Sequence, residues 1–529
     1  MRAMRLYGVE SEGESAAVAP ARPEVRGKFL WTGTTKFFVR GVSYGPFQPD
    51  STGCPFPGDE QMGQDFARMR QAGINTVRVY YVPPQRLLDL ASQWGIRVLV
   101  GIPWGQHICF LDDRKSIKEV HASISRAVRF CSGHPSILAY LIGNEIPSPI
   151  VRWHGPSKIR RFLEQLYDTA KAMDPLALVT YANYPPTEYL EADFVDFHSF
   201  NVYLHAEDDY RRYLARLHNL VGDKPLILTE FGMDAIRAGE EHQAQTLSWQ
   251  VRSAFEMGAA GTVIFTWTDD WFTGGYQITD WAFGLVDADR KPRKAYFAVQ
   301  EAYQSPCPPL PEDPPKISVV VCAYNAEPTM RDCLESLTKL AYPNYEVIVV
   351  DDGSTDQTGA IAEEYPQFKI IHQPNRGLSA ARNVGMAAAT GEIVAYTDSD
   401  AMPDPHWLTY VALKFTSTDF VGIGGPNLPP PEEDWRANCV AAAPGSPTHI
   451  LLDDETAEHI PGCNMAFRKD ALAEVGGFDP TYTAAGDDVD ICWRLQALGY
   501  KLGFSPAAIV WHHRRKTVRS YLKQQMGYG

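Results

Sequence analysis

The sequence predicts an α/β protein of two domains, a (β/α)8 barrel followed by a second α/β domain built on a parallel sheet. Eight short apolar runs precede residue 305, and eight strand–helix units in about 280 residues are what such a barrel requires. Residues 305–315 hold six prolines in eleven positions, which neither a helix nor a central strand tolerates. After residue 316, strand-like runs alternate with helical patterns, as in a parallel sheet.

The apolar runs of the first domain predict its strands. They lie at residues 37–43, 76–80, 97–101, 137–142, 178–181, 194–200, 226–229 and 262–267. The amphipathic segments between them that predict helices include residues 65–71, 86–94, 117–130 and 159–173. An open, doubly wound sheet is the structural alternative to a closed barrel.

Composition sets the limits of the domains. Residues 1–25 are rich in Ala, Glu, Pro and Ser and have no apolar segment, which predicts a disordered tail and not a signal peptide. The proline-rich residues 305–315 predict an extended linker, so we expect domains at 26–304 and 316–529. Residues 521–529 resemble a helix without a capped end, which predicts a truncated chain whose missing tail carries membrane helices or acceptor contacts.

Charge and cysteine content exclude several classes of protein. The 529 residues carry a net charge of −15, which gives no electrostatic support for nucleic-acid binding. The nine cysteines show no Cys-x-x-Cys spacing, which favours buried thiols in a reducing compartment over a disulfide framework or a zinc site. No stretch has the length of a transmembrane helix. We therefore expect a cytoplasmic protein, or a membrane-associated one if a C-terminal tail is missing.

Two glutamates follow strands of the predicted barrel. Glu145 comes after the fourth strand and Glu230 after the seventh. Barrel enzymes carry their chemistry at the C-terminal ends of the strands, and a pair of carboxyl groups at one mouth can cleave a glycosidic bond. One carboxyl group must be protonated and the other ionised, so their surroundings must separate their pKa values. Ordinary salt bridges at strand ends are the alternative.

Four motifs in the first domain resemble the TIM barrel of glycoside hydrolase family 2 and its clan. They are Gly73-Ile74-Asn75-Thr76-Val77-Arg78-Val79, Gly143-Asn144-Glu145, Asn201-Val202-Tyr203 and Leu228-Thr229-Glu230-Phe231-Gly232. The resemblance covers residues 35–300 or so and implies retaining cleavage of a β-glycosidic bond. Glu145 would be the acid/base and Glu230 the nucleophile. The sandwich domains that precede the barrel in the family are missing, which leaves the substrate open.

The same resemblance implies a set of substrate-binding residues. Asn144 would bind the sugar 2-hydroxyl, with Asn201 beside it. Tyr203 would hydrogen-bond the nucleophile, and Arg78 would supply positive charge beneath it. Trp267, at the end of the eighth strand, either stacks on a sugar face or packs in the core.

Acidic residues also follow two strand-like runs of the second domain. Asp351 and Asp352 come after one run, and Asp398 and Asp400 after the next. The carboxyl ends of parallel strands meet at the crevice where such sheets bind ligands. Hard divalent ions take carboxylate oxygens and share them with substrate phosphates. A merely acidic turn is the alternative.

The order of motifs from residue 316 to residue 529 resembles the family 2 glycosyltransferases. The motifs are Ala323-Tyr324-Asn325, Asp351-Asp352-Gly353-Ser354, residues 376–385 with Arg382, Asp398-Ser399-Asp400, residues 461–468 and Asp487-Asp488. The resemblance implies a nucleotide-sugar-binding domain of the GT-A type. It also implies a nucleotide-sugar donor such as a UDP-sugar, a glycan acceptor and inverting transfer.

This resemblance assigns further roles by position. Asp351 and Asp352 would contact the nucleoside. The donor-binding set would be completed by Ala323, Asn325, Arg382 and Asp398. Asp398 and Asp400 would hold Mg2+ or Mn2+ on the diphosphate, and His512 either adds a metal contact or is a surface residue.

Asp488 is the candidate base that deprotonates the acceptor hydroxyl. Relatives usually have Glu-Asp where this sequence has Asp487-Asp488, so the second carboxylate is kept. Burial and a neighbouring like charge can raise the pKa of a carboxylate and make it a better base. The alternative is that the two aspartates only cap the helix that follows.

The sequence therefore predicts a bifunctional carbohydrate enzyme, an inverting glycosyltransferase joined to a retaining β-glycosidase or transglycosidase. Three alternatives remain. The barrel is a non-catalytic module that binds glycan for the transferase, or the barrel is the enzyme and the second domain only binds donor, or neither site turns over.

Overall fold

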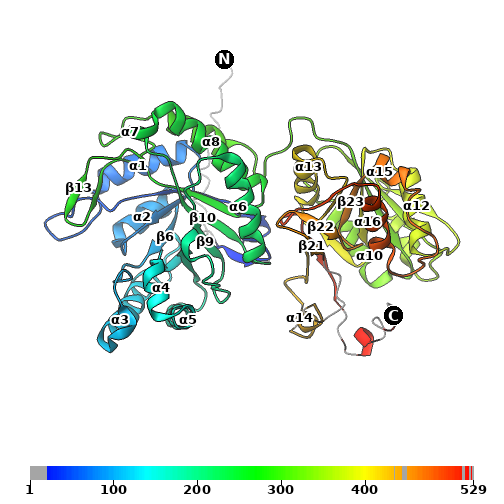
Figure 1. Ribbon diagram of the computed structural model, residues 1–529, viewed down its shortest axis with the longest axis horizontal. Helices are drawn as coiled ribbons and strands as arrows, with labels where there is room; N and C mark the ends of the chain where they lie inside the picture. The colour runs from blue at the N-terminus through cyan, green and yellow to red at the C-terminus, as the bar shows by residue number, and fades with distance from the viewer. Residues whose placement is uncertain are drawn as a thin grey trace, which may run out of the picture.

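The computed structural model describes residues 21–433, 435–441, 443, 449–514, 517, 519–522 and 526. It contains two α/β domains side by side, joined by a segment that passes over the top of the view in Figure 1. Most of the predicted disordered tail and of the predicted C-terminal helix lies outside the described residues. None of the helices in the described part of the chain is long and apolar enough to cross a bilayer.

Eight parallel strands close into a barrel in the first domain, which confirms the predicted fold class. The strands are buried along most of their length because helices cover them outside and side chains fill the interior. Their bounds are β4 (Val39–Ser43), β5 (Thr76–Val79), β6 (Arg97–Gly101), β7 (Ile137–Asn144), β8 (Leu178–Asn183), β9 (His198–Asn201), β10 (Leu226–Phe231) and β11 (Gly261–Ile264).

The helices of the barrel alternate with these strands. α3 begins where the Asp113 carboxylate accepts hydrogen bonds from the backbone N–H groups of Lys115 and Ser116, as an N-cap aspartate does. The helices are α1 (Asp59–Gln71), α2 (Gln85–Gln93), α3 (Arg114–Cys131), α4 (Ser148–His154), α5 (Pro156–Met173), α6 (Glu207–Leu220), α7 (Ala235–Ala238), α8 (Glu240–Glu256) and α9 (Lys294–Gln304). Two short 3-10 turns lie at Phe110–Asp112 and Pro185–Thr187.

Two small antiparallel sheets accompany the barrel. The first precedes it and consists of β1 (Glu24–Arg26), β2 (Phe29–Thr32) and β3 (Thr35–Lys36). The second is a hairpin after the last barrel strand, formed by β12 (Trp271–Thr273) and β13 (Tyr276–Ile278). The sequence pattern predicted no strand in either segment.

The second domain is built on a nine-stranded mixed sheet. Its centre is parallel, because β14 pairs in parallel with both β15 and β17, whereas β17 pairs antiparallel with β23. The strands are, in sheet order, β16 (Lys369–His372), β15 (Tyr345–Asp351), β14 (Ile317–Ala323), β17 (Ile393–Asp398), β23 (Met465–Arg468), β19 (Gly422–Gly424), β24 (Leu502–Phe504), β22 (Thr456–His459) and β21 (Ile450–Leu451).

A second, smaller sheet follows the acidic end of β17. It consists of β18 (Ala401–Pro403), β25 (Val510–His512) and β20 (Asn427–Leu428), with β25 in the middle. The helices of this domain are α10 (Glu327–Leu337), α11 (Thr358–Glu363), α12 (Leu378–Ala388), α13 (Trp407–Ser417), α14 (Trp435–Ala441), α15 (Lys469–Glu474) and α16 (Asp487–Ala497). The buried apolar cluster of the barrel continues into this domain through Phe29, Phe38 and Tyr410.

Candidate active sites of the two domains

A buried arginine organises the mouth of the barrel. Arg78 lies in β5, and its side chain is 1% exposed. Its guanidinium is 2.9 Å from Glu230 Oε1 and donates to Asn144 Oδ1 at 2.7 Å and to Asn201 Oδ1 at 3.2 Å. The four side chains come from β5, β7, β9 and β10, so residues far apart in the sequence meet at the C-terminal ends of the strands.

Glu230 is held at both carboxylate oxygens. Arg78 pairs with Oε1, and the Tyr203 hydroxyl donates to Oε2 at 3.1 Å. Burial and the charge of Glu230 raise the pKa of Tyr203 well above its usual value, which keeps the phenol protonated as a donor. These two contacts fix the position of the Glu230 carboxylate at the mouth of the barrel.

Glu145 has the opposite electrostatic surroundings. Burial and the negative charge of Glu230 raise its pKa, although the hydrogen bond from Asn201 Nδ2 to Glu145 Oε1, 2.7 Å long, lowers it in part. The backbone of Glu145 has φ 50°, in the left-handed region that residues other than glycine seldom adopt. Strained backbone of this kind gathers at functional sites when the surroundings hold it in place. The surroundings of Glu145 therefore favour its protonated form.

Aromatic residues lie beside this cluster, and one of them, Tyr80, was not among the candidates taken from the sequence. Tyr80, which follows β5, lies under the Arg78 guanidinium at 4.7 Å and contacts Trp271 at 5.5 Å between ring centroids. Trp281 packs against both Phe265 and Trp271. Its position two residues after Arg78, at a strand end, was the sequence feature that could have identified Tyr80 as a site residue. Trp267 is fully buried and packs against Tyr296, which is what its alternative role as a core residue requires.

In the second domain, Asp398, Asp400 and His512 meet at the edge of the sheet. One ligand atom from each lies within 4.8 Å of the others. Asp398 ends β17, Asp400 precedes β18, and His512 ends β25, which pairs with β18 through the opposed residues Ala401 and His512. Two carboxylates and one imidazole suit Mg2+ or Mn2+, so the residues present fit the ion that the family implies.

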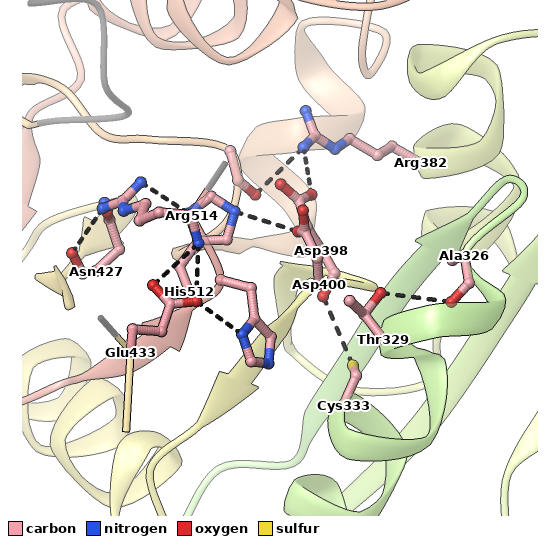
Figure 2. Close-up of polar contacts among 12 residues, drawn as sticks. Ala326, Thr329, Cys333, Arg382, Asp398, Asp400, Asn427, Glu433, His512 and Arg514 are labelled. Atoms are coloured by element: carbon pink, nitrogen blue, oxygen red, sulfur yellow. Dashed lines mark hydrogen bonds and ion pairs between the residues drawn. The ribbon is translucent and has the colours of Figure 1, made fainter. Parts of the chain in front are cut away.

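The hydrogen bonds of His512 define its tautomer (Figure 2). Arg514 donates to Nδ1 at 2.9 Å, and a guanidinium cannot accept, so the neutral ring carries its proton on Nε2. That N–H faces Asp400 Oδ1 at 3.2 Å. Coordination through Nε2 would require the other tautomer, with the proton on Nδ1. Arg514 would then lose its bond to the ring and keep Asn427 as a partner. Arg514 was not among the candidates taken from the sequence.

Arg382 links this cluster to the start of α16. It is 3% exposed, forms an ion pair with Asp487, and lies 3.4 Å from Asp398 Oδ1. It also donates to the Gly462 carbonyl at 3.2 Å. A buried guanidinium between two carboxylates fixes their positions. This geometry gives Arg382 a positioning role, and a direct contact with donor stays a prediction.

Asp488 lies in the first turn of α16. Its Oδ2 accepts a hydrogen bond from the Gly462 N–H at 2.9 Å, and its Oδ1 accepts one from the Val489 N–H at 3.0 Å. The N-cap position itself belongs to Gly486, in a left-handed conformation with φ 86°. Asp488 is therefore tied to the segment at 461–468 and does not occupy the N-cap.

The predicted nucleoside end of the site is also assembled at strand ends. Ala323 pairs with Asp351 across β14 and β15. Burial raises the pKa of Asp351, but hydrogen bonds from Ser354 and His372 outweigh it, so the pKa is lowered. Asp352 accepts from Gln373 Nε2 at 2.6 Å and from the Gly377 N–H at 2.9 Å.

Asn325 completes this edge of the sheet. Its Oδ1 accepts a hydrogen bond from the Thr355 N–H at 2.9 Å, so it joins the turn after β14 to the turn after β15. Its backbone has φ 50°, a value that asparagine tolerates better than most residues. Contacts of Asn325, Asp351 and Asp352 with a nucleoside stay a prediction.

The chain thus combines a barrel with paired glutamates at its mouth and a sheet with an Asp-x-Asp cluster at its edge. The chain belongs to the glycosyl hydrolases of family 2 through its TIM barrel domain, matched over residues 24–306, and it carries a family 2 glycosyl transferase domain, matched over residues 318–476. The fusion expected from the sequence is thereby confirmed.

The curated relatives match the transferase half. A pre-mycofactocin glycosyltransferase of Mycobacterium tuberculosis is 32% identical over 237 residues, which are 42% of this chain and 48% of the relative. Glycosyltransferase AglE of Haloferax volcanii is 31% identical over 226 residues, which are 41% of this chain and 72% of the relative. The chain spans about half the length of the first of these relatives.

The solved structures match the barrel half. A family 2 β-galacturonidase from Eisenbergiella tayi, bound to galacturonate, shares 23% identity and a TM-score of 0.46, covering 54% of each chain. A β-glucuronidase from Ruminococcus gnavus, in complex with D-glucuronic acid, shares 18% identity and a TM-score of 0.46, covering 53% of this chain and 52% of the other.

Proposed function

We propose that the second domain transfers a sugar from a nucleotide-sugar donor to a glycan acceptor with inversion. The observation that carries this proposal is the convergence of Asp398, Asp400 and His512 within 4.8 Å at the sheet edge, in a domain of the glycosyltransferase family. A Mg2+ or Mn2+ ion held there supplies charge that stabilises the departing diphosphate. Asp351, Asp352 and Asn325 would bind the nucleoside.

Asp488 acts as the base in this proposal. The acceptor hydroxyl oxygen forms a bond to the anomeric carbon, the bond from that carbon to the diphosphate oxygen breaks, and Asp488 takes the hydroxyl proton. The Gly462 N–H fixes one oxygen of Asp488, which orients the carboxylate. Arg382 and Asp487 hold the start of α16 against Asp398 and keep the base near the donor.

We infer that the barrel cleaves or transfers β-linked sugars with retention. Glu230, held in place by Arg78 and Tyr203, attacks the anomeric carbon, and protonated Glu145 gives its proton to the departing oxygen. Glu145 then takes a proton from water, or from a sugar hydroxyl in transglycosylation, and this nucleophile displaces Glu230. The raised pKa of Glu145, and the contacts of Glu230 with Arg78 and Tyr203, support this assignment of roles.

A donor screen tests the transferase proposal. The purified chain is offered UDP-glucose, UDP-galactose, UDP-N-acetylglucosamine and GDP-mannose with Mn2+ or Mg2+, and release of the nucleotide is measured. We expect one donor to be turned over and the activity to disappear with a chelator and return with added ion. Failure of all donors would contradict the proposal and leave the barrel as the remaining candidate enzyme.

The pH dependence of β-glycoside cleavage tests the barrel proposal. Glu145 must be protonated to act as an acid, and burial next to Glu230 raises its pKa. Activity should therefore persist above the usual pKa of a glutamate and fall as the pH rises through the raised value. The measurement is kcat/KM on an aryl β-glycoside over the range from about pH 4 to pH 9. A fall already complete near the ordinary value of about 4.3 would contradict the assignment.

A further inference from the structure

The transferase domain contacts the base of the barrel. Asn219, at the end of α6, donates to Asp454 Oδ1 at 2.9 Å. A Cβ added at Gly258, in the loop from α8 to β11, would lie 2.3 Å from Ala507 Cβ. Both segments lead into barrel strands, whereas Glu145 and Glu230 lie where strands end. The barrel therefore presents its mouth away from the contact, and its base is the face that can influence the transferase.

The β1–β3 sheet makes the most buried of these contacts. Lys36, at the end of β3, pairs with Asp404 at 2.6 Å, and the two side chains are 3% and 0% exposed. Phe29 stacks on Tyr410 of α13, with ring centroids 6.0 Å apart and an interplanar angle of 21°. Lys36 Nζ also lies 3.9 Å from the centre of the Phe29 ring. Removing one partner of a pair this far from water leaves the other group buried and unpaired, which is strongly unfavourable.

Asp404 connects this contact to the metal cluster. It directly follows β18, whose other end adjoins Asp400. Asp404 Oδ1 also accepts a hydrogen bond from the His406 N–H at 2.9 Å, so the carboxylate fixes the turn from β18 into α13. Lys36 thus holds one end of a strand of three residues, and Asp400 lies at the other end.

A second contact reaches the strand that carries His512. Gly27 has φ 54°, and a Cβ added there would lie 2.8 Å from both Leu428 and the Trp511 ring. Leu428 and Trp511 are paired partners in β20 and β25, and His512 is the next residue along β25. The β1–β3 sheet therefore contacts the outer strand β20, the middle strand β25 and, through Lys36, the residue that directly follows the other outer strand, β18.

We propose that the β1–β3 sheet of the barrel domain is a structural part of the transferase site, with Lys36 as a positioning residue that places Asp400 and His512 through Asp404. This rests on the proposed metal-dependent transfer. Ion ligands must be placed to within about 0.5 Å, and groups that orient them change affinity by about 10- to 100-fold when removed. The barrel thus serves the transferase independently of its own chemistry.

The test measures Mn2+ binding to the full-length chain by electron paramagnetic resonance, with donor hydrolysis and thermal unfolding alongside. Lys36→Met should weaken Mn2+ binding by about 10- to 100-fold, and Lys36→Arg should restore most of it. Lys115→Met is the matched control, because the Lys115 side chain on α3 is 82% exposed. This variant should bind Mn2+ as the wild type does. If Lys36 has a purely structural role, Lys36→Met should lower the unfolding temperature and leave the Kd for Mn2+ unchanged.

Each outcome decides between the proposals. Unchanged Mn2+ binding in folded Lys36→Met overturns the positioning role and leaves the transferase proposal intact. No Mn2+ binding by the wild type overturns the metal site itself, and the positioning role with it. If Lys36→Met does not fold, Phe29→Leu decides. It removes the ring that stacks on Tyr410 and lies against Lys36 Nζ, and it should weaken Mn2+ binding in the same direction.

Discussion

Replacing Asp488 by asparagine is expected to lower the rate of sugar transfer by about 10²- to 10⁴-fold, the usual contribution of a general base. The amide oxygen of asparagine can still accept the hydrogen bond that the Gly462 N–H donates, so the position of the side chain is kept. The amide cannot take a proton from the acceptor hydroxyl. We therefore expect kcat to fall while Mn2+ affinity and donor KM stay near their wild-type values.

Asp490→Asn provides the control for this prediction. Asp490 lies in the same first turn of α16, but its carboxylate pairs with Arg494 at 2.7 Å on the helix itself. Both variants remove one negative charge near the helix N-terminus, so a general electrostatic effect would appear in both. If the transfer rate of Asp488→Asn is within a few-fold of that of Asp490→Asn, Asp488 is not the base. It then only stabilises the start of α16.

The fold could be predicted from the sequence because its strands are short apolar runs between helical patterns. The run at 76–80 became β5 and the run at 226–229 became part of β10. The β1–β3 sheet was missed because its strands have two to four residues, too few for an alternating pattern to stand out in a polar segment. Its contacts include the pair of Lys36 with Asp404 in the second domain, which the local sequence does not encode.

The candidate site residues could be predicted only where a carboxylate follows a predicted strand, because that residue type at that position indicates catalysis or metal binding. Glu145, Glu230, Asp398 and Asp400 stood out for that reason, and the structure brings each pair of strand ends together. Partners that complete the sites come from distant segments. Arg514 bonds to His512, and Gln373 bonds to Asp352, by contacts that depend on tertiary packing. No local pattern marks such residues.

Replacing Glu230 by glycine is expected to abolish β-glycoside cleavage, with a loss of about 10³-fold or more, because the covalent intermediate can no longer form. Arg78 and Tyr203 remain in place and leave a positively charged space beneath the sugar. Azide added to this variant should enter that space and restore turnover of a substrate with a good leaving group. One displacement by azide inverts the anomeric centre, so the product should be an α-glycosyl azide.

The matched variant Glu145→Ala separates the two glutamates by stereochemistry. Here Glu230 still forms the glycosyl-enzyme, and azide resolves it in a second displacement, so the product should be a β-glycosyl azide. Glu240→Gln, on the outer helix α8, should cleave substrate as the wild type does. Identical azide products from both variants would contradict the assigned roles. A wild-type chain that cleaves no β-glycoside but binds glycan at this mouth would instead make the barrel a binding module, since the aromatic residues around Tyr80 and Trp271 need no ionised nucleophile to hold a sugar.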